Sequence, residues 1–210
     1  TTLATALTKK YKAATLAVCP DRLTPMLPIW FPTTEDGEVE SLGHLLTYVH
    51  PEEATVIRHI ATTGKYPDRG FLGYKNGESR FAHPEYTDEQ VADLLQKLTE
   101  MADYIFVEAN ANRFDDVFSR VAWAQAAIRI LVRAPGPGDE VFFRAQGKLI
   151  NETGGCEIWQ VLNHPVGDVF LPGEEALEHW GGADVIIPYA ASVKEAYFEG
   201  RMTDCLGSRR

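Results

Sequence analysis

Hydrophobic and polar residues along the second half of this chain form a regular succession of strand-like and helix-like segments. Short apolar runs predict buried strands at residues 104–107, 127–132, 157–162 and 184–187. Amphipathic segments with a helical period alternate with them, at residues 91–101, 114–121, 139–149, 173–180 and 192–200. Strands that alternate with helices in this way predict an α/β fold, a doubly wound and mainly parallel sheet with helices on both faces.

The apolar run at residues 104–107 is the strand around which we expect this sheet to be organised. Four large apolar residues between Asp103 and Glu108 predict a strand buried on both faces, near the middle of the sheet. Thr87 and Gln90 form a capping box that opens the helix before it. Ligands of open α/β sheets bind outside the carboxyl ends of the strands, so Glu108 is expected at the rim of a site. The alternative is that Glu108 is only the first solvated residue after a core strand.

The first half of the chain supplies a second acid for the same rim. Its opening residues, 1–11, have the apolar spacing of a helix, and an apolar strand follows at residues 14–19. Asp21 comes just after that strand, as Glu108 comes after its own. Residues 25–43 have the composition of a surface loop, with Trp30 and Phe31 expected to be exposed.

Composition and charge narrow the class of protein. A chain of 210 residues with 45% hydrophobic content can form one core, so we expect a single domain over residues 1–210. A net charge of -10 argues against broad electrostatic binding of nucleic acid and leaves non-specific DNA binding unsupported. Three scattered cysteines, no apolar run of membrane-spanning length and no signal-peptide pattern predict a cytoplasmic protein.

Several motifs of catalytic or metal-binding proteins do not occur in the sequence. The six histidines show no pair at metal-ligand spacing, so we expect them on the surface or in loops. None of the glycine clusters is followed by Lys-Ser or Lys-Thr, so none is a phosphate-binding P-loop. No nucleophile elbow is present either. The residues at the strand ends are therefore the best candidates for chemistry.

Taken together, those strand ends resemble the deviant Walker A ATPases of the ParA/MinD type. Residues 1–7 are similar to the helix that follows a Walker A loop, residues 18–21 to the acidic motif of the second strand, and residues 103–108 to Walker B. Residues 161–164 and 186–189 are similar to the late motifs on the adenine side. Within the family, the pilus-localisation TadZ/CpaE branch is the most similar. The likeness spans most of the chain and is weakest between Phe31 and Tyr86.

The resemblance implies a set of ligands and residue roles. ATP and Mg²⁺ are the implied ligands, with Thr1 and Thr2 binding nucleotide, Thr1 also ligating magnesium, and Glu108 acting on the metal through water. Asp21 is the implied catalytic residue, which orients the attacking water. Asn163, Pro188 and Tyr189 are implied contacts of the adenine. A homodimer that closes on nucleotide is the implied assembly.

The sequence also departs from the family pattern. The 210 residues contain no P-loop. The resemblance places that loop before residue 1. Glu108 stands where the family has an aspartate, Cys19 where it has the first acid of the second-strand motif, and Ala190 where an acid usually follows the late proline.

These departures leave three functions open. The first is an ATP-dependent partitioning or positional switch with weak or lost hydrolysis. The second is a non-catalytic scaffold or localisation protein of ATPase descent that binds partners. The third is a small-molecule ligase or synthetase on the same fold.

Overall fold

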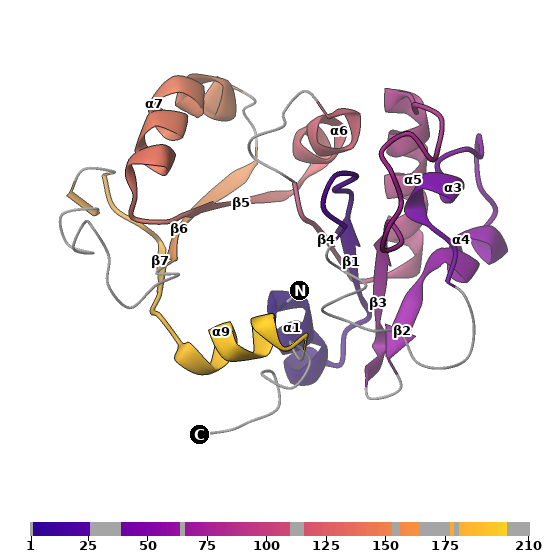
Figure 1. Cartoon of the computed structure of the whole chain (residues 1–210), viewed down its shortest axis with the longest axis horizontal. Helices are drawn as coiled ribbons and strands as arrows, with labels where there is room; N and C mark the ends of the chain where they lie inside the picture. The colour runs from indigo at the N-terminus through magenta and orange to yellow at the C-terminus, as the bar shows by residue number, and fades with distance from the viewer. Residues whose placement is uncertain are drawn as a thin grey trace. The chain divides into compact units, whose positions relative to one another are not determined.

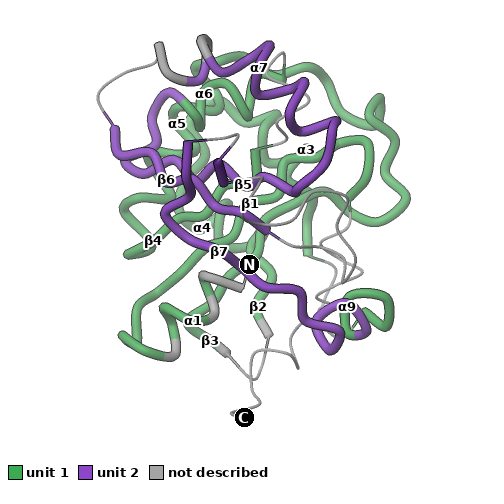
Figure 2. The backbone as a smooth tube through the Cα atoms, turned by 90° about the vertical axis from the view of Figure 1, so that its left-hand side faces the viewer, with its two compact units in different colours: residues 1–123, 196–210 green, residues 124–195 purple. Residues whose placement is uncertain are grey.

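The computed structural model describes residues 2–25, 39–63, 66–109, 116–152, 156–163, 177–178 and 181–200. The chain divides into two compact units, shown in separate colours in Figure 2. Unit 1 comprises residues 1–123 and 196–210, and unit 2 comprises residues 124–195. The single domain over residues 1–210 stays a prediction.

Unit 1 is built on a four-stranded sheet with the order β2-β3-β1-β4 (Figure 1). Strand β1 (Thr15–Cys19) pairs in parallel with β3 (Tyr66–Gly73) on one side and with β4 (Tyr104–Val107) on the other. The short strand β2 (Ala61–Thr63) pairs antiparallel with β3. The sequence predicts only a brief strand at residues 70–74, and β3 begins four residues before it.

The prediction that residues 104–107 lie at the buried centre of the sheet is wrong for the described strands. Among them, β4 pairs only with β1, and its Tyr104 is 45% exposed. The centre is β1, whose Leu16, Ala17 and Val18 are each at most 6% exposed. Both strands are short apolar runs, and their pairing partners, which the hydrophobic pattern does not identify, decide which one is buried.

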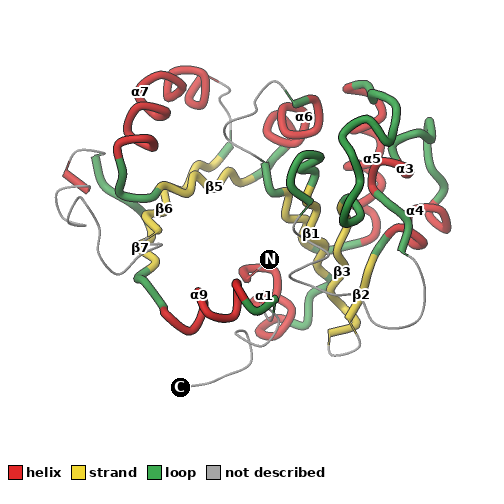
Figure 3. Tube along the Cα trace, viewed as in Figure 1, coloured by secondary structure: helices red, strands yellow, loops and turns green. Residues whose placement is uncertain are grey.

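Helices cover both faces of this sheet, as predicted (Figure 3). Helix α1 (Thr2–Tyr11) packs on the face of Thr15, where the hydroxyls of Thr8 and Thr15 lie 2.8 Å apart. Leu16 and Val18 point to the opposite face and join the main core. The helices that supply buried residues to that core are α3 (Leu42–Leu45), α4 (Glu53–His59), α5 (Asp88–Met101) and α6 (Val117–Gln125).

The predicted capping box of α5 is confirmed. The Thr87 hydroxyl accepts a hydrogen bond from the Gln90 backbone at 3.3 Å, and the Gln90 side chain accepts one from the Thr87 backbone at 2.8 Å. The predicted stripe of Val91, Leu94 and Leu98 is buried. The next helix, α6, begins at Val117, whereas the sequence predicts a helix that starts earlier and carries Asp116 in its first turn. The sequence also predicts Asn112 as the N-cap of this helix, and Asn112 lies outside the described residues.

Unit 2 contains a parallel sheet with the order β5-β6-β7. Its strands are β5 (Ile128–Arg133), β6 (Glu157–Asn163) and β7 (Val185–Ile187), and α7 (Pro137–Glu152) connects the first two. Helix α9 (Ala191–Phe198) follows β7. Apart from residues 177–178, the helix predicted at residues 173–180 lies outside the described part of the chain.

The fold class predicted from the sequence is confirmed. Four of the five described strand pairs are parallel, and helices lie between β1 and β3, between β3 and β4, and between β5 and β6 along the chain. This is the arrangement that strict alternation of strands and helices favours. No described helix combines the length and the apolar character that crossing a membrane requires.

Candidate functional site at the strand ends of unit 1

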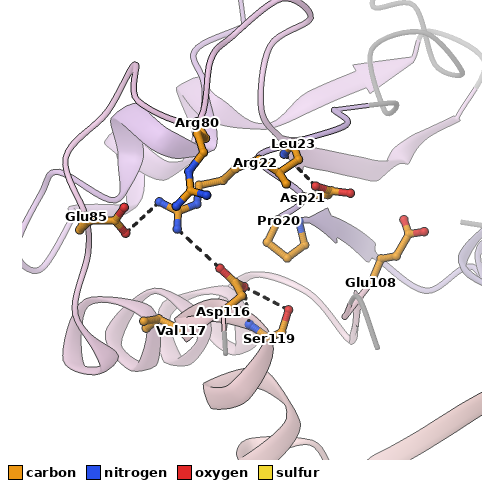
Figure 4. Close-up of a pocket in the computed structure, with 10 residues that line it drawn as sticks. All are labelled: Pro20, Asp21, Arg22, Leu23, Arg80, Glu85, Glu108, Asp116, Val117 and Ser119. Carbon is orange, nitrogen blue, oxygen red and sulfur yellow. Dashed lines mark hydrogen bonds and ion pairs between the residues drawn. The ribbon is translucent and has the colours of Figure 1, made fainter. Parts of the chain in front are cut away.

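A pocket of about 270 Å³ lies where β1 and β4 end (Figure 4). Because these strands are parallel and adjacent, with Val18 opposite Val107, the residues that follow them emerge at the same edge of the sheet. The pocket is lined by Pro20, Asp21, Arg22, Leu23, Arg80, Glu85, Glu108, Asp116, Val117 and Ser119. The structure thus brings together Asp21 and Glu108, the two acids that the sequence placed on one rim.

Asp21 is held by the turn that it begins. Its Oδ1 accepts hydrogen bonds from the backbone N–H groups of Leu23, at 2.8 Å, and Thr24, at 3.2 Å. Its Oδ2 accepts a hydrogen bond from the Thr24 hydroxyl at 2.6 Å. An aspartate readily bonds the backbone two and three residues ahead in this way, which fixes the loop after β1. The carboxylate therefore has a defined orientation at the pocket edge.

Glu108 is tied to the neighbouring strand through Cys19. The Glu108 backbone N–H donates to the Val18 carbonyl at 2.9 Å, which extends the pairing of β1 and β4 by one residue. The Cys19 thiol donates to Glu108 Oε2 at 3.3 Å. Burial and the nearby charge of Glu108 raise the pKa of the Cys19 thiol far above its usual range, because both oppose a thiolate. Cys19 is therefore a neutral hydrogen-bond donor to this carboxylate.

The opposite wall of the pocket is an ion-pair network centred on Arg22. Its Nη1 donates to Glu85 at 2.9 Å, and its Nη2 lies 3.9 Å from Asp116 Oδ1. Asp116 Oδ2 also accepts hydrogen bonds from the backbone and the hydroxyl of Ser119, at 2.9 and 3.1 Å, and so caps the start of α6. The Tyr86 hydroxyl donates to Asp116 at 3.2 Å, and burial together with that carboxylate raises the pKa of Tyr86 to about 12. This wall joins the loop after β1 to α6.

The charge of the lining indicates what kind of ion suits the pocket. Four carboxylates and two guanidinium groups line it, which gives a net charge of -2. Hard carboxylate oxygens at an acidic rim suit a magnesium ion that keeps several of its waters. The same lining is a poor cradle for phosphates on its own, since its arginines are fewer than its acids.

The remaining predicted site residues lie elsewhere. Thr1 is outside the described residues, and only the backbone of Thr2, the first residue of α1, is described. Helix α1 packs against β1 after a link of three residues, so the two run antiparallel and the first turn of α1 lies toward the strand ends that hold Asp21. In unit 2, Asn163 ends β6 opposite Ile187 of β7, and Pro188 and Tyr189 follow β7. Those three residues therefore share one edge of the unit 2 sheet.

Sequence reasoning missed two features of unit 1. The arginines of the pocket were not predicted, although Arg22 directly follows Asp21 and so had to lie near the same strand end. A cluster of Glu40, His44 and His59 was also missed, and the expectation that the histidines lie on the surface or in loops is wrong for His59, which is 1% exposed. His44 and His59 lie 15 residues apart, a spacing with no metal signature.

Comparison with known proteins identifies the fold through solved structures alone. No protein-family model matches the sequence, and a search among curated proteins finds no significant relative. Solved structures match over nearly the whole chain at low identity. A ParA family ATPase from Chlorobium tepidum TLS is 15% identical with a TM-score of 0.77, over 100% of this chain and 85% of that one.

Two nucleotide complexes are among the other matches. The septum site-determining protein MinD of Pyrococcus horikoshii OT3, complexed with Mg-ADP, is 20% identical with a TM-score of 0.70, over 98% of this chain and 81% of that one. A plasmid partition protein of Borrelia burgdorferi B31 bound to AMPPNP is 12% identical with a TM-score of 0.68, over 95% and 82% of the two chains. The chain thus has the fold of the ParA/MinD-type ATPases, as its resemblance to them predicted.

Proposed function

We propose that this chain, which has the ParA/MinD-type fold, works as a positional switch governed by ATP and Mg²⁺. The observation that carries the proposal is that Asp21 and Glu108 line one pocket at the carboxyl ends of two adjacent parallel strands. Ligands of open α/β sheets bind at this edge. The Mg-ADP and AMPPNP complexes of proteins with this fold support the same class of ligand.

Glu108 would hold magnesium through water, with Thr1 as a direct ligand. The oxygen-rich, acidic rim of the pocket fits a hydrated magnesium ion, because Mg²⁺ prefers hard oxygen donors and gives up its waters reluctantly. Magnesium, when bound, neutralises charge on the transferring phosphate. The hydrogen bond from Cys19 fixes where the Glu108 carboxylate points, so that Glu108 is already oriented before a ligand arrives.

Asp21 is the residue that we assign to the attacking water. Its turn holds the carboxylate at the pocket edge through bonds to Leu23 and Thr24. A fixed carboxylate that accepts a hydrogen bond from water can orient it for in-line attack. The phosphates themselves require a loop of backbone amides and a lysine, which the resemblance places before Thr1.

The adenine would lie at the edge of the unit 2 sheet that carries Asn163. Its side chain offers both a donor and an acceptor, as an adenine edge requires. The backbone of Pro188 and Tyr189, after the adjacent strand β7, would supply the remaining contacts. We further propose a homodimer in the cytosol that nucleotide closes and hydrolysis releases.

One observation favours a second candidate, a scaffold that has lost hydrolysis. Where the family has an acid, Cys19 is a neutral thiol whose hydrogen bond goes to Glu108. The thiol and the carboxylate bond to each other and need no metal ion. A site that has lost hydrolysis would contain such a pair. The scaffold would keep the fold and act through partners.

Calorimetric titration with ATP, with and without Mg²⁺, tests the proposal. It should be carried out on the printed chain and on a version extended before Thr1 by a Gly-Lys-containing Walker loop. We expect weak binding and negligible hydrolysis by the printed chain, because the loop and its lysine supply most of the charge compensation. The extended chain should bind tightly and only with Mg²⁺, and Glu108→Gln should weaken that binding.

The outcomes separate the candidates. No binding by the extended chain would overturn the switch and favour the scaffold. Tight Mg²⁺-dependent binding by the printed chain would mean that the phosphate site lies elsewhere. Asn163→Ala tests the adenine assignment independently, because it should reduce the preference for ATP over GTP without abolishing the effect of Mg²⁺.

A further inference from the structure

Unit 1 contains a second cluster of ligand atoms that shares no residue with the Asp21 pocket. Glu40 lies just before α3, His44 lies in α3, and His59 ends α4. His44 Nδ1 lies 2.6 Å from Glu40 Oε2, and His59 Nε2 lies 3.2 Å from the same oxygen and 3.4 Å from His44 Nδ1. Three atoms that each can bind a cation thus meet at one point.

The hydrogen bonds around the cluster determine which of these atoms carry protons. His59 Nδ1 lies 2.7 Å from the Thr55 carbonyl, which can only accept, so Nδ1 carries a proton and donates it. In a neutral imidazole the lone pair is then on Nε2, which faces the carboxylate of Glu40. The proton of His44 Nδ1 is used in its own short bond to Glu40. With these protons assigned, His59 Nε2 and Glu40 Oε2 face each other as two acceptors, and a cation between them would satisfy both.

Either a second proton on His59 or a metal ion can supply that positive charge. The His59 side chain is fully buried, with 0% of its surface exposed. Burial disfavours a charged imidazolium, because the charge would be removed from water. Neutral imidazole nitrogen is the form that binds metal.

We propose that Glu40, His44 and His59 form a binding site for a divalent transition-metal cation, with Zn²⁺ as the best-suited ion. Zinc takes nitrogen and carboxylate ligands at about 2.0–2.2 Å in a tetrahedron, whose ligand atoms lie about 3.3 Å apart. The distances of 3.2 and 3.4 Å from His59 Nε2 already match that spacing. Only the pair of His44 and Glu40 has to open. The metal takes the place of the proton on His44 Nδ1, and that proton moves through solvent to Nε2 of the same ring.

The surroundings of the cluster suit such a site. The side chains of His44 and Glu40 are 45% and 39% exposed, so they can adjust, and an ion can reach them from solvent. The Thr55 carbonyl holds the ring of His59 in the orientation that a metal-ligating histidine usually receives from its second nitrogen. Three protein ligands leave the fourth position to water. The bound ion would join the segment that enters α3 to the end of α4.

Isothermal titration of the full chain, free of affinity tags and stripped with EDTA, with Zn²⁺ at neutral pH tests the site. We expect one Zn²⁺ per chain, with affinity lowered about tenfold or more by Glu40→Gln and by His44→Asn. The matched control is His50→Asn. His50 is an exposed histidine of the same unit that also pairs with a carboxylate, of Asp93, but it belongs to no three-ligand cluster among the described residues. Its φ of 59° suits asparagine, so the control should fold and bind as the parent does.

Cobalt gives a second readout that binding at cysteines does not imitate. Co²⁺ in this site should show the visible absorption of a tetrahedral ion without the intense thiolate charge-transfer bands, and the absorption should disappear in Glu40→Gln. Equal Zn²⁺ affinity in all variants, or no binding by the parent chain, would overturn the proposal. A His59 imidazole that titrates as a cation near neutral pH by NMR, with no effect of Zn²⁺, would overturn it in favour of a simple ion pair.

Discussion

The Cys19 thiol donates a hydrogen bond of 3.3 Å to the Glu108 carboxylate across the adjacent ends of β1 and β4. The resemblance to ParA/MinD-type ATPases places acids at both positions. With a thiol at one of them, the pair carries one negative charge instead of two. A thiol in place of an acid should change the pH dependence of the chain's stability and the affinity of these strand ends for a cation. Both quantities are measurable.

We expect Cys19 to make the stability of the chain fall as pH rises into the alkaline range. Burial and Glu108 raise the pKa of the folded thiol, so its contribution is fully present below about pH 8.5, the pKa of an unfolded thiol. Above that pH the unfolded chain loses a proton that the folded chain retains. The parent should therefore lose stability more steeply than Cys19→Ala, by at most about 1.4 kcal/mol per pH unit.

Urea unfolding at about pH 7, 8.5 and 9.5 checks this expectation. The control is Cys156→Ala, since Cys156 lies just before β6 in unit 2 and removing it should leave the slope of the parent unchanged. Parallel pH profiles for the parent and Cys19→Ala would show that the thiol is not held neutral by Glu108.

The position of Asp21 and Glu108 at one edge of the sheet was predictable from the sequence, because it follows from the direction of parallel strands. Each acid follows an apolar run, and parallel strands that pair side by side present their carboxyl ends at one edge. The order of strands within the sheet was not predictable in the same way. Residues 15–19 and 104–107 have similar apolar patterns, but of these two strands, β1 and β4, β1 alone has a described strand on each side.

The cluster around His59 could not be predicted from sequence patterns, for a related reason. Its ligands come from two segments, residues 40–44 and the end of α4, which meet when α4 packs beside α3, whereas a motif search uses only their separation along the chain. Burial of His59 is similarly a tertiary property. Val56 and Ile57 are adjacent apolar residues of α4 that point in different directions, so the pattern does not decide whether the face of Val56 and His59 is the buried one.

The capping box of α5 should contribute measurably to the stability of unit 1. Thr87→Ala removes one of the two reciprocal hydrogen bonds, and we expect a loss of about 1 kcal/mol in the free energy of unfolding. Gln90→Ala should cost more, because the Gln90 amide also donates to the Leu46 carbonyl at 2.9 Å and ties α5 to the end of α3. Denaturant midpoints compared with Gln96→Ala, on the exposed face of the same helix, check both values. A smaller loss for Gln90→Ala than for Thr87→Ala would contradict this account.

Cys19→Asp should replace the pair of thiol and carboxylate with two neighbouring carboxylates, which a bound cation would stabilise. A second carboxylate at the position of the thiol would face Glu108 at a distance near 3.3 Å, where two ionised acids repel each other and one of them must take up a proton. Without metal, this variant should therefore be less stable than the parent at neutral pH. Two carboxylates that converge in this way are also better ligands for Mg²⁺ than one.

Thermal unfolding with and without millimolar Mg²⁺ makes this prediction quantitative. Binding to the folded state alone raises stability by about 2.7 kcal/mol at a hundredfold excess over the dissociation constant, so Cys19→Asp should gain several degrees from Mg²⁺. The parent should gain little. Cys19→Asn is the control, because it has the shape of the aspartate without its charge and should not respond to Mg²⁺. If Cys19→Asp responds no more than Cys19→Asn does, then Glu108 does not face the position that a magnesium ion would occupy, and the assignment of this pocket to the nucleotide site fails.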